Sequence, residues 1–166
     1  MKNYIQYLQE FYEDIEHYLN EVFDTKFDID WISSNNANIN VDGKNYNFFT
    51  KIVVNFPKFG KISHVQFTDE DGNFNITGGA KNSFKVFSAI KQALLYWLEK
   101  EKPDGFYFTS KEESRNRLYY SFSKKIEQES NYIFGYDLAS ELIETDTVNV
   151  DENDGLYVFV RKGKRN

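Results

Sequence analysis

Apolar side chains recur at intervals of three and four over the first 22 residues. The positions are Ile5, Leu8, Tyr12, Ile15, Leu19 and Val22, with Glu10, Glu13, Glu16 and Glu21 lying off the stripe. This spacing is typical of one face of an α-helix. It predicts an amphipathic helix over residues 3–22, which either packs on a sheet or binds a partner.

Alternation of apolar and polar residues then replaces the helical spacing. It predicts strands at residues 27–33, 37–41, 46–56, 61–68 and 73–77. In the long third strand, the alternation places Tyr46, Phe48, Ile52, Val54 and Phe56 on one face. Turn signals at residues 42–43 and 69–72 favour tight connections and therefore an antiparallel meander.

The stretch from residue 76 to residue 126 has the pattern of strand, glycine turn, helix, strand and helix. Its first helix, from Ser83 to about Lys100, is apolar over more than half its circumference and so must be heavily buried. The short apolar run 105–109 predicts an interior strand, which we expect to be parallel to the strand at 73–77. Ser110 and Glu113 have the spacing of a capping box, which predicts that the second helix starts at Ser110.

The last 35 residues carry weaker signals. Residues 131–136 fit a strand, and residues 137–143 fit either a short helix or a strand. A polar loop is expected at 148–154, and Gly155 to Arg161 has the composition of a strand.

Length and composition indicate one packed domain. A chain of 166 residues is too short for two ordinary domains, and 18% aromatic residues supply large rings for its core. The net charge of −6 argues against nucleic acid or an acidic membrane as partner, apart from the basic run 161–165, which fits a solvated terminus or a binding segment. Cysteine is absent, and no run is apolar enough for a signal peptide or membrane helix, so a cytoplasmic location is expected.

The order of elements and one short motif resemble the GCN5-related N-acetyltransferases, which use acetyl-CoA. That superfamily marks its cofactor turn with Gln or Arg, two variable residues, Gly, one variable residue, and Gly or Ala. Here Asn75-Ile76-Thr77-Gly78-Gly79-Ala80 matches at Gly78 and Ala80. The resemblance spans residues 46–162 and follows 45 residues of helix and early strands. It implies an α+β fold: a twisted, mostly antiparallel sheet with one parallel junction and helices on both faces.

The resemblance also implies a site. The backbone N–H groups of Gly78, Gly79, Ala80, Lys81 and Asn82 would bind the pyrophosphate of acetyl-CoA. The strand backbone near residues 75–77 would orient the thioester, and Tyr119 would protonate the leaving thiolate. The family's last helix begins with Asn and, three residues on, Ala; Glu112 and Arg115 stand at those positions here. Arg115 shares the inward face of Tyr119 and therefore needs a carboxylate or a phosphate.

Each of these residues also fits an ordinary structural role. The glycine pair suits a tight turn, and Tyr119 suits a core position with its hydroxyl hydrogen-bonded. For the proton acceptor of an amine, the candidates are His64 and the acidic turn 69–71, although His64 equally fits a structural histidine. Residues 149–153 begin like a calcium loop but lack its glycine and final glutamate, so no metal site is expected.

A second resemblance leads to a different function. The phrase Ser114-Arg115 followed by Leu118-Tyr119, after a strand preceded by Lys102-Pro103, is similar to small bacteriophage proteins. It implies a non-catalytic protein that engages a host factor in a bacterial cytoplasm and needs no cofactor. Acetyl transfer from acetyl-CoA to an amine and host-protein binding therefore remain as two hypotheses, because one scaffold can host either.

Overall fold

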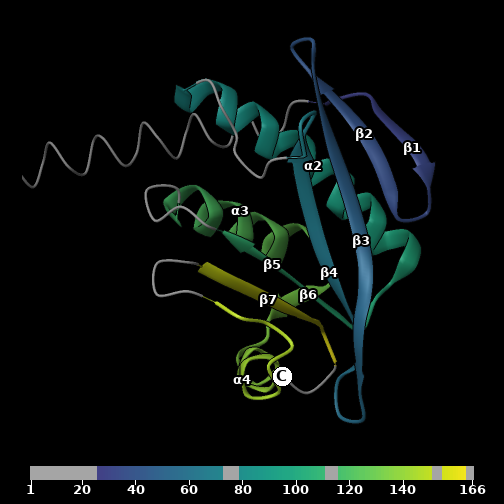
Figure 1. Ribbon diagram of the computed structural model, residues 1–166, viewed down its shortest axis with the longest axis vertical. Helices are drawn as coiled ribbons and strands as arrows, with labels where there is room; N and C mark the ends of the chain where they lie inside the picture. Colours follow the sequence, from purple (N-terminus) through teal and green to yellow (C-terminus); the bar gives the residue numbers. More distant parts are fainter. Residues whose placement is uncertain (1–25, 73–78, 111–115, 151–154, 164–166) are drawn as a thin grey trace, which may run out of the picture.

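A computed structural model describes residues 26–72, 79–110, 116–150 and 155–163, and omits the side chains of residues 79–84 and 116–118. Seven strands form one sheet in the order β1-β2-β3-β4-β5-β7-β6 (Figure 1). The strands are β1 (Ile29–Ser33), β2 (Asn36–Val41), β3 (Lys44–Phe56), β4 (Gly60–Asp69), β5 (Gly105–Ser110), β6 (Tyr132–Phe134) and β7 (Gly155–Arg161). Within these strands, β4 and β5 run parallel and every other neighbouring pair is antiparallel.

Three described helices cover the two faces of the sheet (Figure 1). On one face, α2 (Gly79–Glu101) and α3 (Asn116–Glu129) bury Phe87 and Phe122 against β-strand side chains such as Phe48 and Phe106. On the other face, α4 (Tyr136–Glu144) packs its buried Leu138 with a second, smaller cluster. The predicted α+β arrangement, with one parallel junction and helices on both faces, is confirmed.

A β-bulge makes strand β3 contribute to both cores. Ile52 pairs with Ser63, but Val54 pairs with Ile62, so the strand carries one extra residue at this point. Because side chains alternate between faces, the extra residue transfers the following positions to the opposite face. Tyr46 and Phe48 therefore join the α2–α3 core, Phe56 joins the α4 core, and Ile52 is 58% exposed. The prediction of one shared face along β3 is wrong beyond Ile52.

The hairpin between β2 and β3 has the predicted turn. Asp42 and Gly43 both adopt positive φ, at 52° and 83°. Two positive-φ residues in a two-residue loop match the right-handed twist of the flanking strands. The predicted strands at 27–33, 37–41, 46–56 and 61–68 are all confirmed to within two residues.

The structure also tests the elements predicted for the C-terminal half. The strands at 105–109, 131–136 and 155–161 are confirmed, and the ambiguous segment 137–143 is helical. Residues 148–150 lie outside helices and strands, as the expected loop requires, and Val148 within them is buried. Ser110 is the last residue of β5, in a ladder pair with Gly155, and the predicted helix start after it falls on residues 111–115, which lie outside the described residues. The strand parallel to β5 is β4, whereas the sequence suggested residues 73–77; these, like the predicted helix 3–22, lie outside the described residues.

Candidate functional site

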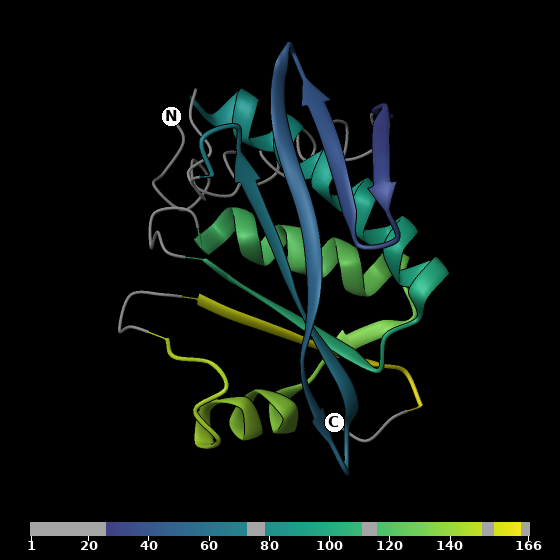
Figure 2. The same ribbon diagram turned by 45° about the vertical axis from the view of Figure 1, so that its right-hand side comes forward.

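Strands β4 and β5 are paired only near their amino ends. Three ladder pairs join them, Ile62 with Gly105, Ser63 with Phe106 and His64 with Tyr107. Beyond these pairs β4 stays with β3 up to Asp69, while β5 stays with β7 up to Ser110. The two strands therefore diverge toward their carboxyl ends, as Figure 2 shows. We call this region, residues 65–69 and 108–110, the β4–β5 divergence.

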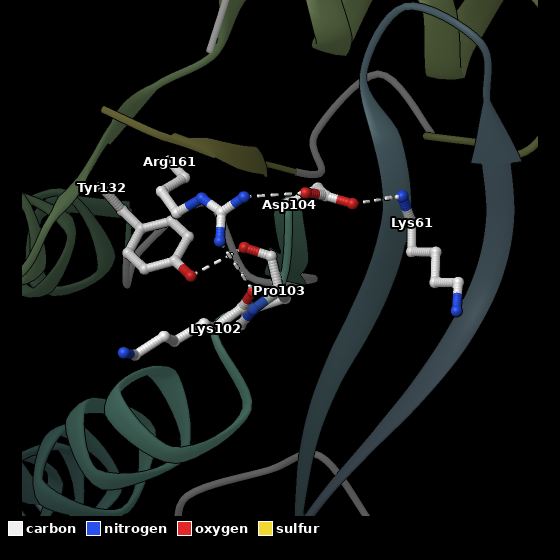
Figure 3. A network of polar contacts seen from close by, with 6 residues as sticks. All are labelled: Lys61, Lys102, Pro103, Asp104, Tyr132 and Arg161. Atoms are coloured by element: carbon white, nitrogen blue, oxygen red, sulfur yellow. Dashed lines mark hydrogen bonds and ion pairs between the residues drawn. The ribbon is translucent and has the colours of Figure 1, made fainter. Parts of the chain in front are cut away.

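The carboxylate of Asp104 links the strands at the end of the β4–β5 pair where the two strands are still hydrogen-bonded (Figure 3). Its Oδ2 accepts a hydrogen bond from the Lys61 N–H at 2.9 Å, and its Oδ1 lies 3.1 Å from Nη2 of Arg161. The Arg161 N–H also donates to the backbone oxygen of Asp104 at 3.1 Å. One aspartate thus connects the starts of β4 and β5 to the end of β7, and Arg161 belongs to a strand rather than to a solvated terminus.

Tyr132 adds a further contact at the same end. Its hydroxyl donates a hydrogen bond to the Pro103 oxygen at 2.7 Å (Figure 3). Burial raises the pKa of this hydroxyl well above its ordinary value, and the Arg161 charge only partly offsets that rise. The phenol therefore stays protonated and keeps donating throughout the physiological pH range.

We expect Gly60→Ala to destabilise the protein more than the same change at Gly43. Both glycines have positive φ, at 85° and 83°, so each variant carries the left-handed penalty of about 1–2 kcal/mol. A Cβ at Gly43 meets nothing within 4 Å, whereas one at Gly60 would overlap Oδ2 of Asp104. Displacing that carboxylate should cost a further ~1–2 kcal/mol in lost hydrogen bonds. Urea unfolding of both variants measures the difference, and equal losses would contradict it.

Aromatic rings fill the helix side of the β4–β5 divergence. Tyr119, from the first turn of α3, is 6% exposed. Its ring centroid lies 6.3 Å from Phe67 on β4 and 6.2 Å from Phe108 on β5. Phe87 of α2 meets Tyr119 edge-on at 4.8 Å, and Tyr157 of β7 stacks on it at 5.8 Å. Tyr119 thus bridges the two strands where their backbone pairing has ended.

A second polar group joins this aromatic cluster. Ser110 is 1% exposed and forms a side-chain hydrogen bond with Tyr157. Burial raises the pKa of the Tyr157 hydroxyl, and the smaller effect of the Ser110 hydrogen bond lowers it. The carboxyl end of β5 therefore places two tyrosines and a serine together, a grouping that the capping-box interpretation of Ser110 missed.

The opposite face of the same junction carries a histidine. His64 stacks on Tyr107 with a centroid distance of 4.6 Å and an interplanar angle of 9°. Burial lowers the pKa of the imidazole and raises that of the Tyr107 hydroxyl. At neutral pH both side chains are uncharged.

Two helix N-termini lie at the open end of the junction. Helix α2 begins at Gly79, and its Phe87 contacts Phe67 near the end of β4. Helix α3 begins six residues after the end of β5, and its Tyr119 meets the same Phe87. Neither helix has an acidic residue in its first turn. The partial positive charges of both N-termini therefore add at this end of the sheet and favour an anion.

The structure places part of the predicted site here. The backbone of Gly79 to Asn82 forms the first turn of α2, whose N–H groups have no partner within the helix. Tyr119 lies at the β4–β5 divergence, as described above. Gly78 and Arg115 lie outside the described residues. The strand backbone beside the divergence belongs to β4, whereas the sequence suggested residues 75–77.

The sequence offered little signal for the remaining residues of the site. Ser110 and Tyr157 are 47 residues apart in the chain and meet because β5 pairs with β7. The contact between Ser110 and Tyr157 could be predicted only if the pairing of β5 with β7 were already known.

No protein-family model, curated protein or solved structure matches this chain. In the part of the chain that the structure describes, no helix is long and apolar enough to cross a membrane. The same residues contain no cluster of three or more side chains suited to a metal ion.

Proposed function

We propose that this protein binds an acyl-coenzyme A and transfers the acetyl group of acetyl-CoA to an amine, in a bacterial cytoplasm. The observation that carries the proposal is the parallel β4–β5 pair, which separates after three residue pairs. Two helix N-termini without acidic residues in their first turns lie at the open end of this pair. Strand, helix and strand follow in the order that the acetyltransferase resemblance implies.

Each part of the coenzyme has a counterpart in this arrangement. The pyrophosphate would bind the N–H groups of Gly79, Ala80, Lys81 and Asn82, where the helix dipole favours negative charge. The pantetheine arm carries two amides, which match a strand edge that has lost its ladder partner. The thioester would then lie beside Tyr119, and the phenol of this residue would protonate the departing thiolate.

We expect acetyl-CoA to raise the melting temperature of the wild-type protein. At a concentration of 100 times Kd the stabilisation is about 2.7 kcal/mol, or roughly 5–10 °C for a domain of this size. Lys81→Glu should remove most of this shift, because a carboxylate in the first turn of α2 repels the pyrophosphate while suiting the helix dipole. Differential scanning fluorimetry with acetyl-CoA, and with pantetheine as a probe lacking the pyrophosphate, measures both effects.

Lys100→Glu is the matched control for this experiment. It makes the same change of charge in the last turn of the same helix, and it should leave the acetyl-CoA shift intact. Absence of any shift in the wild-type protein at about 1 mM acetyl-CoA, the upper range of typical substrate affinities, would overturn the proposed function.

A second function, binding of a host protein without catalysis, is favoured by one observation. Tyr119 is packed as a core residue among four other rings, and that packing by itself explains its presence. In that case the β4–β5 divergence is a structural feature filled by side chains. The absence of an acetyl-CoA shift, together with recovery of one defined protein in a pull-down from bacterial lysate, would support this alternative.

A further inference from the structure

Five asparagines gather on the face of β2 and β3 that points away from α2. The residues at positions 37, 39 and 41 of β2 are buried in the α2–α3 core, so alternation turns Asn36, Asn38 and Asn40 toward the other face. Asn45 and Asn47 of β3 pair with Asn40 and Asn38 and share that face. Figure 1 shows α4 beside β7, away from these strands, so among the described helices none covers the asparagines. We call this surface the asparagine face.

Hydrogen bonds between the amides fix their directions. Nδ2 of Asn47 donates to Oδ1 of Asn36 at 2.9 Å and to Oδ1 of Asn38 at 3.2 Å. Nδ2 of Asn40 donates to Oδ1 of Asn45 at 2.9 Å. The amide oxygens of Asn36, Asn38 and Asn45 are thus engaged, while their NH₂ groups donate to no other described residue. Three positioned NH₂ groups remain for a ligand, and side chains held in this way lose little entropy on binding.

Two carboxylates border the amides and complete a hollow. Asp30 of β1 is the ladder partner of Asn38, and Asp28 lies two residues earlier. Both are exposed, and neither forms an ion pair or hydrogen bond with another described residue. Together with Asn38, Asn40 and Asn45 they line a hollow of about 580 Å³, within the usual range for small-ligand sites. The hollow therefore places hydrogen-bond acceptors about 5 Å from donors, the separation of cross-strand pairs.

A phenylalanine lies beside the hollow on the same face of the sheet. Phe49 follows Asn47 by two residues on β3 and pairs with Asn36 of β2 and Gln66 of β4. It is half-buried and packs against neither core cluster. At about 3.3 Å per residue, its Cα lies roughly 7 Å along the strand from that of Asn47. One flat apolar ring is thus framed by amide side chains.

These groups together match one ligand chemistry. A hydroxyl accepts a hydrogen bond from an amide NH₂ and donates one to a carboxylate, so it uses both kinds of group in the hollow. An ammonium cannot pair with NH₂ donors, and Asp28 and Asp30 repel an anion. The C–H face of a sugar ring is apolar and suits the electron-rich face of Phe49. A chain of uncharged sugar rings supplies both the hydroxyls and this apolar face.

We propose that the asparagine face binds a neutral oligosaccharide. One sugar ring occupies the hollow, where its hydroxyls accept from the NH₂ groups of Asn38 and Asn45 and donate to Asp28 and Asp30. A second ring stacks on Phe49. This site does not depend on the function proposed above, because it uses none of the residues assigned to acetyl-CoA.

Isothermal titration calorimetry of the full-length protein tests the proposal. The probes are cellopentaose, chitopentaose and maltopentaose, each at up to about 10 mM, ten times the weakest Kd expected, about 1 mM. We expect at least one of them to bind. Sorbitol, which has the hydroxyls but no ring, should not bind at the same concentration.

Two substitutions assign the binding to this face. Asn38→Asp keeps the oxygen that accepts from Asn47 but replaces the outward NH₂ with a second acceptor, so Kd should rise at least about 10-fold. Phe49→Leu keeps an apolar side chain but removes the flat ring, so Kd should rise about 10-fold. Asn55→Asp makes the same change as the first variant at an exposed position of β3 beyond the bulge, and Kd should not change. Circular dichroism checks that all three variants are folded.

The remaining outcomes decide against the proposal. Absence of binding by all three oligosaccharides would overturn it, as would equal binding of sorbitol. Binding of spermidine in place of the oligosaccharides would show a cation site instead. Oligosaccharide binding that neither substitution weakens would place the site elsewhere on the molecule. An effect of Asn38→Asp alone would remove Phe49 from the site, and an effect of Phe49→Leu alone would remove the hollow.

Discussion

Phe108→Ala is expected to lower the free energy of unfolding by about 3–5 kcal/mol, the usual cost of removing a buried phenylalanine. Phe108 is 1% exposed and lies at the start of the β4–β5 divergence. Its ring contacts Phe122 edge-on at 5.5 Å and stacks with Tyr157 at 5.2 Å and Phe159 at 6.1 Å. Rigid strands and helices surround it, so the cavity cannot easily close. Urea unfolding followed by circular dichroism measures the loss.

Tyr120→Ala provides the control for this prediction. Tyr120 is adjacent to the buried Tyr119 on α3 but is 55% exposed, and its ring meets the Lys124 ammonium at 5.5 Å. Losing an exposed contact of this kind should change stability by no more than about 0.5–1 kcal/mol. Similar losses for both variants, or a loss below about 1 kcal/mol for Phe108→Ala, would show that the cluster is less tightly packed than the ring geometry indicates.

Asp104→Ala should destabilise the protein by about 2–4 kcal/mol, because it removes a hydrogen-bonded charge and leaves two donors without their acceptor. The Lys61 N–H and the Arg161 guanidinium both depend on this carboxylate. The side chains of Asp104 and Arg161 are 24% and 32% exposed, so water can replace only part of the interaction. Asp104→Asn keeps an acceptor oxygen without the charge and should cost about half as much. Urea unfolding of both variants gives the comparison.

A double-mutant cycle with Gly60→Ala sharpens this prediction. In the Asp104→Ala background the contacts with the carboxylate are gone and only the Cβ of residue 104 remains close, at 2.9 Å from the added Cβ, so Gly60→Ala should cost less than it does in the wild-type protein. Asp30→Ala, which removes an exposed carboxylate on β1, should change stability by no more than about 0.5 kcal/mol. Additive losses at Gly60 and Asp104 would contradict the contact between them.

The candidate site was predictable only in part. The glycine turn and Tyr119 were found from a motif and a helical stripe, which are features of neighbouring residues. His64 was recognised as a candidate from its chemistry alone, without any signal for its position beside Tyr107. The ion pair between Asp104 and Arg161 joins residues 57 positions apart, and no local sequence pattern predicts it. The spacing of Ser110 to Glu113 gave no signal that Ser110 pairs with Gly155 of β7 as the last residue of β5.

The sequence by itself determined the type and order of the described elements other than α4, because helix and strand periodicity are properties of adjacent residues. Residues 137–143 fitted a helix or a strand, and the structure shows them to be helical. It also determined that the fold is α+β, with a meander followed by alternating helices and strands. The tertiary structure decided that β4 is the parallel partner of β5, and that the two strands part after three pairs. It also decided that a bulge in β3 divides that strand between two cores. These features depend on which distant strands pair and how their rings pack, and such contacts exist only once the chain has folded.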